Sequence, residues 1–94
     1  MPSYTMRENI ELLIALGDVY LAANRWGEAF HEYTRALVRF QEDRTEDQIE
    51  ANKELHWRFA LIRLNLSACH LVEGHLDEAK PLLTYAITAF TSIK

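Results

Sequence analysis

The sequence predicts an all-α fold with four helices in two antiparallel helix hairpins, of which the third helix is lengthened. The first observation is a duplicated spacing of small residues, which indicates two close helix crossings of the same kind. In the two copies these residues are Gly17, Ala29 and Ala36, and then Ser67, Ala79 and Ala86. The second observation is a pair of capping boxes, Thr5-Met6-Arg7-Glu8 and Thr45-Glu46-Asp47-Gln48, each of which marks a helix start. We therefore predict one domain over residues 1–94, with repeats over about 10–40 and 60–94 and a linker with a helix extension over 41–59.

The first hairpin is expected to contain one helix from the Thr5 capping box to about Ala23 and another over about 26–40. Asn24 can adopt the left-handed conformation that ends the first helix. Gly17 is expected to face the second helix, where its missing side chain permits a close approach. The apolar stripe of the first helix should contain Leu13, Leu16, Val19 and Tyr20.

The second hairpin is expected to begin at the Thr45 capping box with a helix that continues without a break to Val72. Gly74 is a good candidate for the left-handed residue that closes this helix. The fourth helix should then begin near Leu76 or Asp77. The extra length of the third helix is the main departure of the second hairpin from the first.

The formal net charge of -4 argues against binding to nucleic acid, which requires clustered lysine and arginine. The acidity is concentrated in residues 42–50, and we interpret this run as a solvated linker and first helical turn, with an acidic docking site as the alternative.

No leader sequence and no apolar run of membrane-spanning length is recognisable. The single cysteine, Cys69, suits a small buried residue in a reducing compartment. We expect a cytoplasmic protein, or a nuclear one, that does not bind nucleic acid or insert into a membrane.

Catalytic and metal-binding patterns are missing from the sequence. His31, His56, His70 and His75 include no pair at the i, i+4 spacing of a helical metal site. There is also no glycine-rich phosphate loop and no nucleophile motif. The sequence therefore predicts a protein that is not an enzyme and has no catalytic residues, no metal and no cofactor.

The duplicated pattern resembles the tetratricopeptide repeat (TPR), a scaffold of helix hairpins that binds other proteins. The residues that carry the resemblance are Leu16-Gly17-Asp18-Val19-Tyr20 with Ala29, Tyr33 and Ala36, and Leu66-Ser67 with His70, Ala79, Leu83 and Ala86. Gly17 and Ser67 lie about 50 residues apart, compared with about 34 for adjacent repeats of this family. The lengthening, together with the segment Asn65-Leu66-Ser67-Ala68-Cys69, is similar to the TPR domains of large immunophilins. The resemblance implies a right-handed helical repeat with a co-chaperone-like role.

The inner face of each first helix forms the binding groove in TPR proteins, so the resemblance implies a partner-binding groove at the matching positions. These positions are Glu11, Ile14, Ala15, Asp18, Leu21, Ala22, Leu61, Leu64, Asn65, Ala68, Leu71 and Val72. Most of them are apolar, which favours an apolar peptide or helix as the ligand. TPR proteins that hold acidic chaperone tails use a clamp with lysine and asparagine where this chain has Ile14 and Asp18, so we do not expect it to bind such tails.

Two repeats leave end surfaces uncovered, because repeat arrays usually need about three repeats or a capping helix. We therefore expect self-association or a protein partner. Trp57 and Phe59 have no counterpart in the repeat pattern, so they are candidate assembly contacts, with core packing as the alternative. The predicted function is a non-catalytic protein-interaction adaptor. The alternatives are a structural subunit whose repeats pack permanently in a homodimer or larger assembly, and a small chaperone for secreted proteins.

Overall fold

The computed structural model describes residues 9–42 and 44–92, and within these ranges the regular structure is entirely helical. The helices are α2 (Ile10–Ala22), α3 (Trp26–Glu42), α4 (Glu46–Glu50), α5 (Lys53–Val72) and α6 (Leu76–Ser92). The predicted all-α fold is therefore confirmed. None of the helices in the described ranges is long and apolar enough to cross a membrane.

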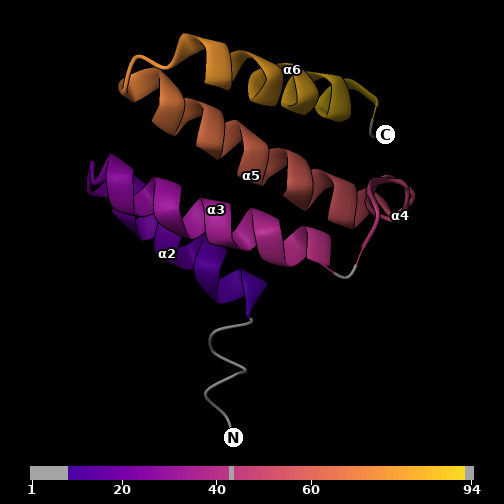
Figure 1. Cartoon of the computed structure of the whole chain (residues 1–94). Coiled ribbons are helices and arrows are strands. Elements are labelled where there is room, and N and C mark those ends of the chain that lie inside the picture. The colour runs from indigo at the N-terminus through magenta and orange to yellow at the C-terminus, as the bar shows by residue number, and fades with distance from the viewer. Residues whose placement is uncertain (1–8, 43, 93–94) are drawn as a thin grey trace, which may run out of the picture.

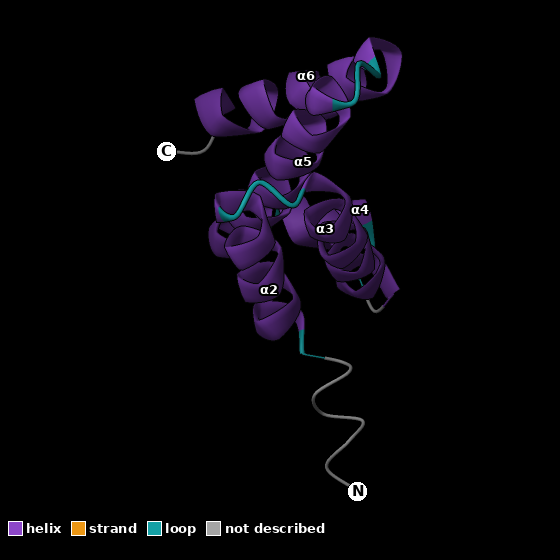
Figure 2. Ribbon diagram, turned by 90° about the vertical axis from the view of Figure 1, so that its left-hand side faces the viewer, coloured by secondary structure: helices purple, strands orange, loops and turns teal. Residues whose placement is uncertain are grey.

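The helices form two packed pairs, α2 with α3 and α5 with α6, and α3 also packs against α5. The helices of each pair run in opposite directions (Figure 1). Figures 1 and 2 both place α5 and α6 on one side of the molecule and α2 and α3 on the other. The short helix α4 packs against α5 and lies in the connection between the pairs.

The turns within the two pairs have the same backbone conformation. Asn24 and Gly74 have φ angles of 62° and 81°, which is the left-handed conformation predicted for both. Each turn is closed by an equivalent hydrogen bond of 2.8 Å, from the amide of Arg25 to the carbonyl of Tyr20 and from the amide of His75 to that of His70. The two helix pairs therefore share a turn structure as well as a residue pattern.

Gly17 lies at a close crossing of α2 and α3, as expected. A Cβ atom built on Gly17 would lie 2.6 Å from Cε1 of the buried Tyr33 ring, so no larger residue fits without a shift of that ring. Ser67, at the equivalent position of α5, is also buried. The later small residues of the pattern are completely buried in both pairs: Ala29, Ala36, Ala79 and Ala86.

The start of the first described helix differs from the prediction. Asn9 caps α2, and its side-chain Oδ1 accepts a hydrogen bond from the amide of Leu12. The helix therefore begins at Ile10, later than expected, and the Thr5-Met6-Arg7-Glu8 capping box lies outside the described residues. Of the residues expected on the apolar stripe of this helix, Leu13 is buried whereas Val19 is exposed.

The predicted unbroken helix from Thr45 to Val72 is wrong. The Thr45 capping box is present, but the helix that it opens ends after Glu50. Asn52 then caps α5, because its side chain accepts hydrogen bonds from the amides of Glu54 and Leu55. The break sets α4 apart from α5 and allows Ile49 to be completely buried.

The core lies where the two pairs meet. Phe59 of α5 stacks on Phe40 of α3, with 5.5 Å between ring centroids, and meets the ring of Tyr85 of α6 edge-on at 5.6 Å. Ile49 of α4 belongs to the same buried cluster. Arg63 lies over the rings of Phe59 and Tyr85, at 4.5 and 4.4 Å from their centroids, so a cation–π contact also connects α5 with α6.

Candidate binding groove between α2 and α5

A groove with a volume of about 400 Å³ lies between α2 and α5. Its lining residues are Glu11, Ile14 and Asp18 from α2, and Trp57, Arg58, Leu61, Ile62 and Asn65 from α5. The lining is mixed: four of these residues are apolar, and the polar ones include the acids Glu11 and Asp18 on different turns of α2. This volume lies within the range of about 300–1,000 Å³ that is usual for ligand-binding clefts.

The structure brings together only part of the predicted groove. Of the twelve positions implied by the TPR resemblance, five line the cavity: Glu11, Ile14, Asp18, Leu61 and Asn65. Leu21, Leu64 and Ala68 are half-buried and do not line it, and Ala15, Ala22, Leu71 and Val72 are exposed outside it. The cavity is therefore limited to the first three turns of α2 and the middle of α5.

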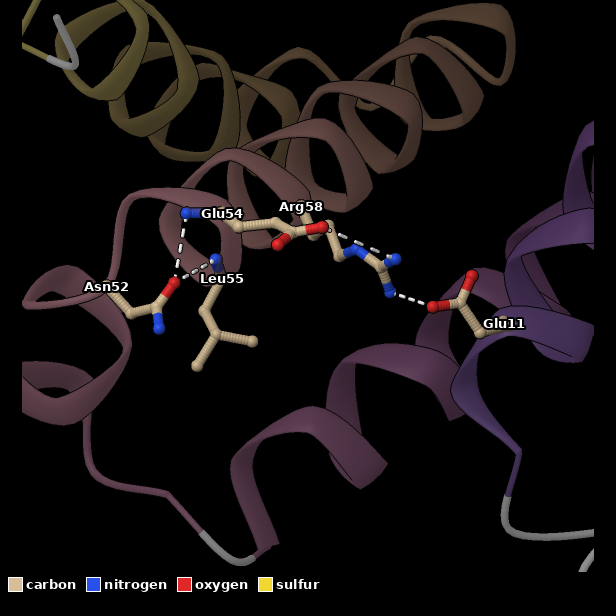
Figure 3. A network of polar contacts seen from close by, with 5 residues as sticks. All are labelled: Glu11, Asn52, Glu54, Leu55 and Arg58. Carbon is tan, nitrogen blue, oxygen red and sulfur yellow. Dashed lines mark hydrogen bonds and ion pairs between the residues drawn. The ribbon is translucent and has the colours of Figure 1, made fainter.

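An ion-pair network crosses one end of the groove (Figure 3). The guanidinium of Arg58 on α5 donates a hydrogen bond to the carboxylate of Glu11 on α2, and its other terminal nitrogen lies 3.9 Å from a carboxylate oxygen of Glu54. The side chain of Arg58 is 34% exposed, whereas those of Glu11 and Glu54 are 65% and 80% exposed. The network links the two helix pairs at the solvent surface. Ion pairs in such exposed positions contribute about 0–1 kcal/mol to the free energy of unfolding.

A second polar contact holds Asp18 in the groove. The hydroxyl of Tyr33 donates to Oδ1 of Asp18 over 2.5 Å, and Asn65 also interacts with this hydroxyl. Burial and the neighbouring carboxylate raise the pKa of Tyr33 well above its usual value, so the phenol stays neutral. Asp18 is therefore positioned by a buried side chain of the neighbouring helix α3.

Trp57 and Phe59, the two candidate assembly contacts, have different environments. Trp57 is 47% exposed, lines the groove and contacts Phe90 of α6 with 4.7 Å between ring centroids. Phe59 is completely buried among Phe40 and Tyr85, so the proposal of an intermolecular contact for Phe59 is wrong. The physical reason is the helical spacing, which turns residues 57 and 59 to different faces of α5.

Sequence reasoning missed Arg58 and Ile62 as groove residues. Arg58 pairs with Glu11, which is distant in the sequence, and no local pattern marks such a contact. Trp57 was noticed as an unexplained aromatic residue but not placed in the groove. Its position four residues before Leu61 was the available signal, since such residues share a helix face.

A smaller apolar cavity of about 250 Å³ lies near the two turns. Its lining residues are Trp26, Gly27, Phe30, Cys69, His70, Glu73 and His75. Phe30 meets the ring of His70 edge-on at 5.1 Å, and burial raises the pKa of the Cys69 thiol. Across the part of the chain that the structure describes, no three histidine, cysteine, aspartate or glutamate side chains are arranged to hold a metal ion.

Comparison of this chain with protein-family models, with curated proteins and with solved structures gave no match.

Proposed function

We propose that this protein is a non-catalytic adaptor of the TPR type, which uses the groove between α2 and α5 to bind a peptide or helix of another protein. The observation that carries the proposal is the groove itself, which is lined by apolar side chains from two separate helices, Ile14, Leu61 and Trp57, together with the polar Asp18 and Asn65. A ligand with an apolar face would cover these walls, and the polar groups would fix its position.

The repeated architecture supports the assignment to the TPR type. Both helix pairs have small buried residues at matching positions, and both turns have the same closing hydrogen bond. In a TPR-like arrangement, the first helices of consecutive repeats face the ligand, and here these helices are α2 and α5. The single buried cysteine, Cys69, supports a location in the cytoplasm or nucleus.

The binding proposal can be tested with peptides selected from a random 12-residue display library against the intact protein. We expect Leu61→Glu to weaken the selected peptides at least tenfold in calorimetry, because a charge would be buried in the apolar contact. Val38→Glu on α3 is the matched control, since Val38 is exposed and lies outside the groove. Helix content measured by circular dichroism shows whether each variant folds, and Leu61→Ala replaces Leu61→Glu if the latter does not.

A second candidate function is that of a structural subunit which packs permanently against another copy or a larger assembly. The observation in its favour is the outer face of α6, where Leu76 and Ile87 are 53% and 55% exposed. These residues are three helical turns apart and therefore share one side of the helix. An apolar face on a terminal helix is the surface on which a further repeat or subunit would pack.

A further inference from the structure

We propose that the segment bound by the groove is basic as well as apolar, with lysine or arginine next to the apolar side chains that enter it. This inference rests on the proposed function and adds the charge of the partner. A preference for a basic partner depends on which charged side chains lie at the groove and on which of these already form ion pairs within the protein.

The charged groups at the groove are predominantly acidic. Glu11 and Asp18 are the acids among its lining residues, and Arg58 is the cation. Arg58 is already engaged by two carboxylates, those of Glu11 and Glu54 (Figure 3). A single guanidinium therefore faces the charges of two acids, and Asp18 adds a third negative charge nearby.

The negative charge of Asp18 is not offset by its own hydrogen bond. Its partner in that bond is the hydroxyl of Tyr33, which is neutral. Asp18 is exposed at the groove, so its carboxylate is accessible to a ligand. A lysine or arginine of the ligand would gain a charge-assisted hydrogen bond there.

An acidic segment would meet the opposite conditions. To reach Arg58 it would have to displace Glu11 or Glu54, and it would be repelled by Asp18. A basic segment leaves the existing ion pairs intact and reduces the excess negative charge. Charge complementarity therefore favours the basic ligand over the acidic one.

The test is the residue composition of peptides selected from the 12-residue display library, with counter-selection against Leu61→Glu protein. The counter-selection removes peptides that bind by charge alone, because this variant carries one additional negative charge. We expect the remaining peptides to be enriched in lysine or arginine beside leucine or aromatic residues. Their affinity should fall about two- to fivefold for each of Glu11→Gln and Asp18→Asn, which is the range of a surface charge contact.

Glu78→Gln on α6 is the matched control, because it removes an exposed acid that does not line the groove and should leave the affinity unchanged. Selected peptides without an excess of basic residues, or affinities indifferent to Glu11→Gln and Asp18→Asn, would overturn the charge inference and leave the proposed function standing. If no peptide is selected, or if all peptides selected before the counter-selection bind Leu61→Glu protein as tightly as the original protein, the proposed function fails as well.

Discussion

Tyr33 connects the packing of the first helix pair with the groove. Its ring fills the space beside Gly17. Its hydroxyl donates a hydrogen bond to Asp18, the residue that follows Gly17 in α2. Tyr33 is completely buried, so its ring cannot move aside without disturbing the core. One side chain of α3 therefore determines both how closely α2 approaches and where an acid of the groove lies.

Gly17→Ala should destabilise the protein by about 1–3 kcal/mol, because the added Cβ would overlap the Tyr33 ring. Gly27→Ala is the control: a Cβ at Gly27 meets nothing within 4 Å, so this change should be neutral or stabilise α3 by up to about 1 kcal/mol. Urea unfolding followed by circular dichroism measures both effects. Equal stabilities for the two variants would show that Gly17 is not required for the close crossing.

Tyrosine ionisation should make the protein less stable at alkaline pH. Burial, followed by nearby carboxylates, raises the pKa of Tyr33 above the usual 10.0 and raises that of Tyr85 to about 12. Between about pH 10 and 12 the unfolded chain therefore binds fewer protons than the folded one, and the free energy of unfolding should fall as pH rises through this window. Below about pH 10 the contribution of these groups is constant.

The measurement is a series of denaturant titrations at pH 9, 10 and 11, with Tyr85→Phe as the comparison. Removing this phenol should make the alkaline decline of stability shallower than in the original protein. Identical slopes would mean that Tyr85 ionises equally easily in the folded and unfolded states.

At the scale of the elements, the start of α4 depends on neighbouring residues alone, whereas the break between α4 and α5 is accompanied by contacts with distant helices. The Thr45 capping box was recognisable in the sequence and is present, because a capping box needs only neighbouring residues. The end of α4 was missed, although Asn52 is of a residue type that favours helix N-caps, because a single asparagine does not by itself show that a helix ends. The burial of Ile49 in the core formed by α3, α5 and α6 accompanies the break, and that core exists only in the folded chain.

Ile49→Ala should therefore cost about 2–5 kcal/mol, although Ile49 lies in a helix of only 5 residues. The reason is that its side chain is completely buried, so truncation leaves a cavity beneath α4. Val38→Ala on α3 is the comparison, because Val38 is 52% exposed and should change stability by less than about 0.5 kcal/mol. Thermal unfolding of the two variants distinguishes them, and similar melting temperatures would show that α4 is not anchored by Ile49.

At the scale of the molecule, the sequence was sufficient for the two helix pairs and their turns, but not for the break between α4 and α5 or for the groove. Helix periodicity and the left-handed residues Asn24 and Gly74 are local features, so they could be identified correctly. The groove depends on how α2 and α5 lie across from each other, which residue spacing within either helix does not specify. Contacts such as Glu11 with Arg58 are therefore found only in the folded structure.

The molecule is thin in one direction, which affects how much apolar surface it can bury without a partner. Its Cα atoms extend 40 × 33 × 19 Å, and the shortest dimension is about two helix diameters. A slab of this thickness cannot enclose all of its helices, which leaves the outer face of α6 with Leu76 and Ile87 exposed. Covering this face with a second copy would remove apolar surface from water.

We therefore expect the protein to associate at tens of micromolar, so that light scattering gives a mass above the 11.0 kDa of one chain. Ile87→Glu should shift the protein to the monomer, because an unpaired charge in an apolar interface costs several kcal/mol. Thr88→Glu is the control, because it introduces the same charge at an exposed position. Thr88 follows Ile87 directly, so its side chain is rotated by about 100° around the helix axis from that of Ile87. A single species of 11.0 kDa before any substitution would contradict self-association and leave the outer face of α6 as a site for a different protein.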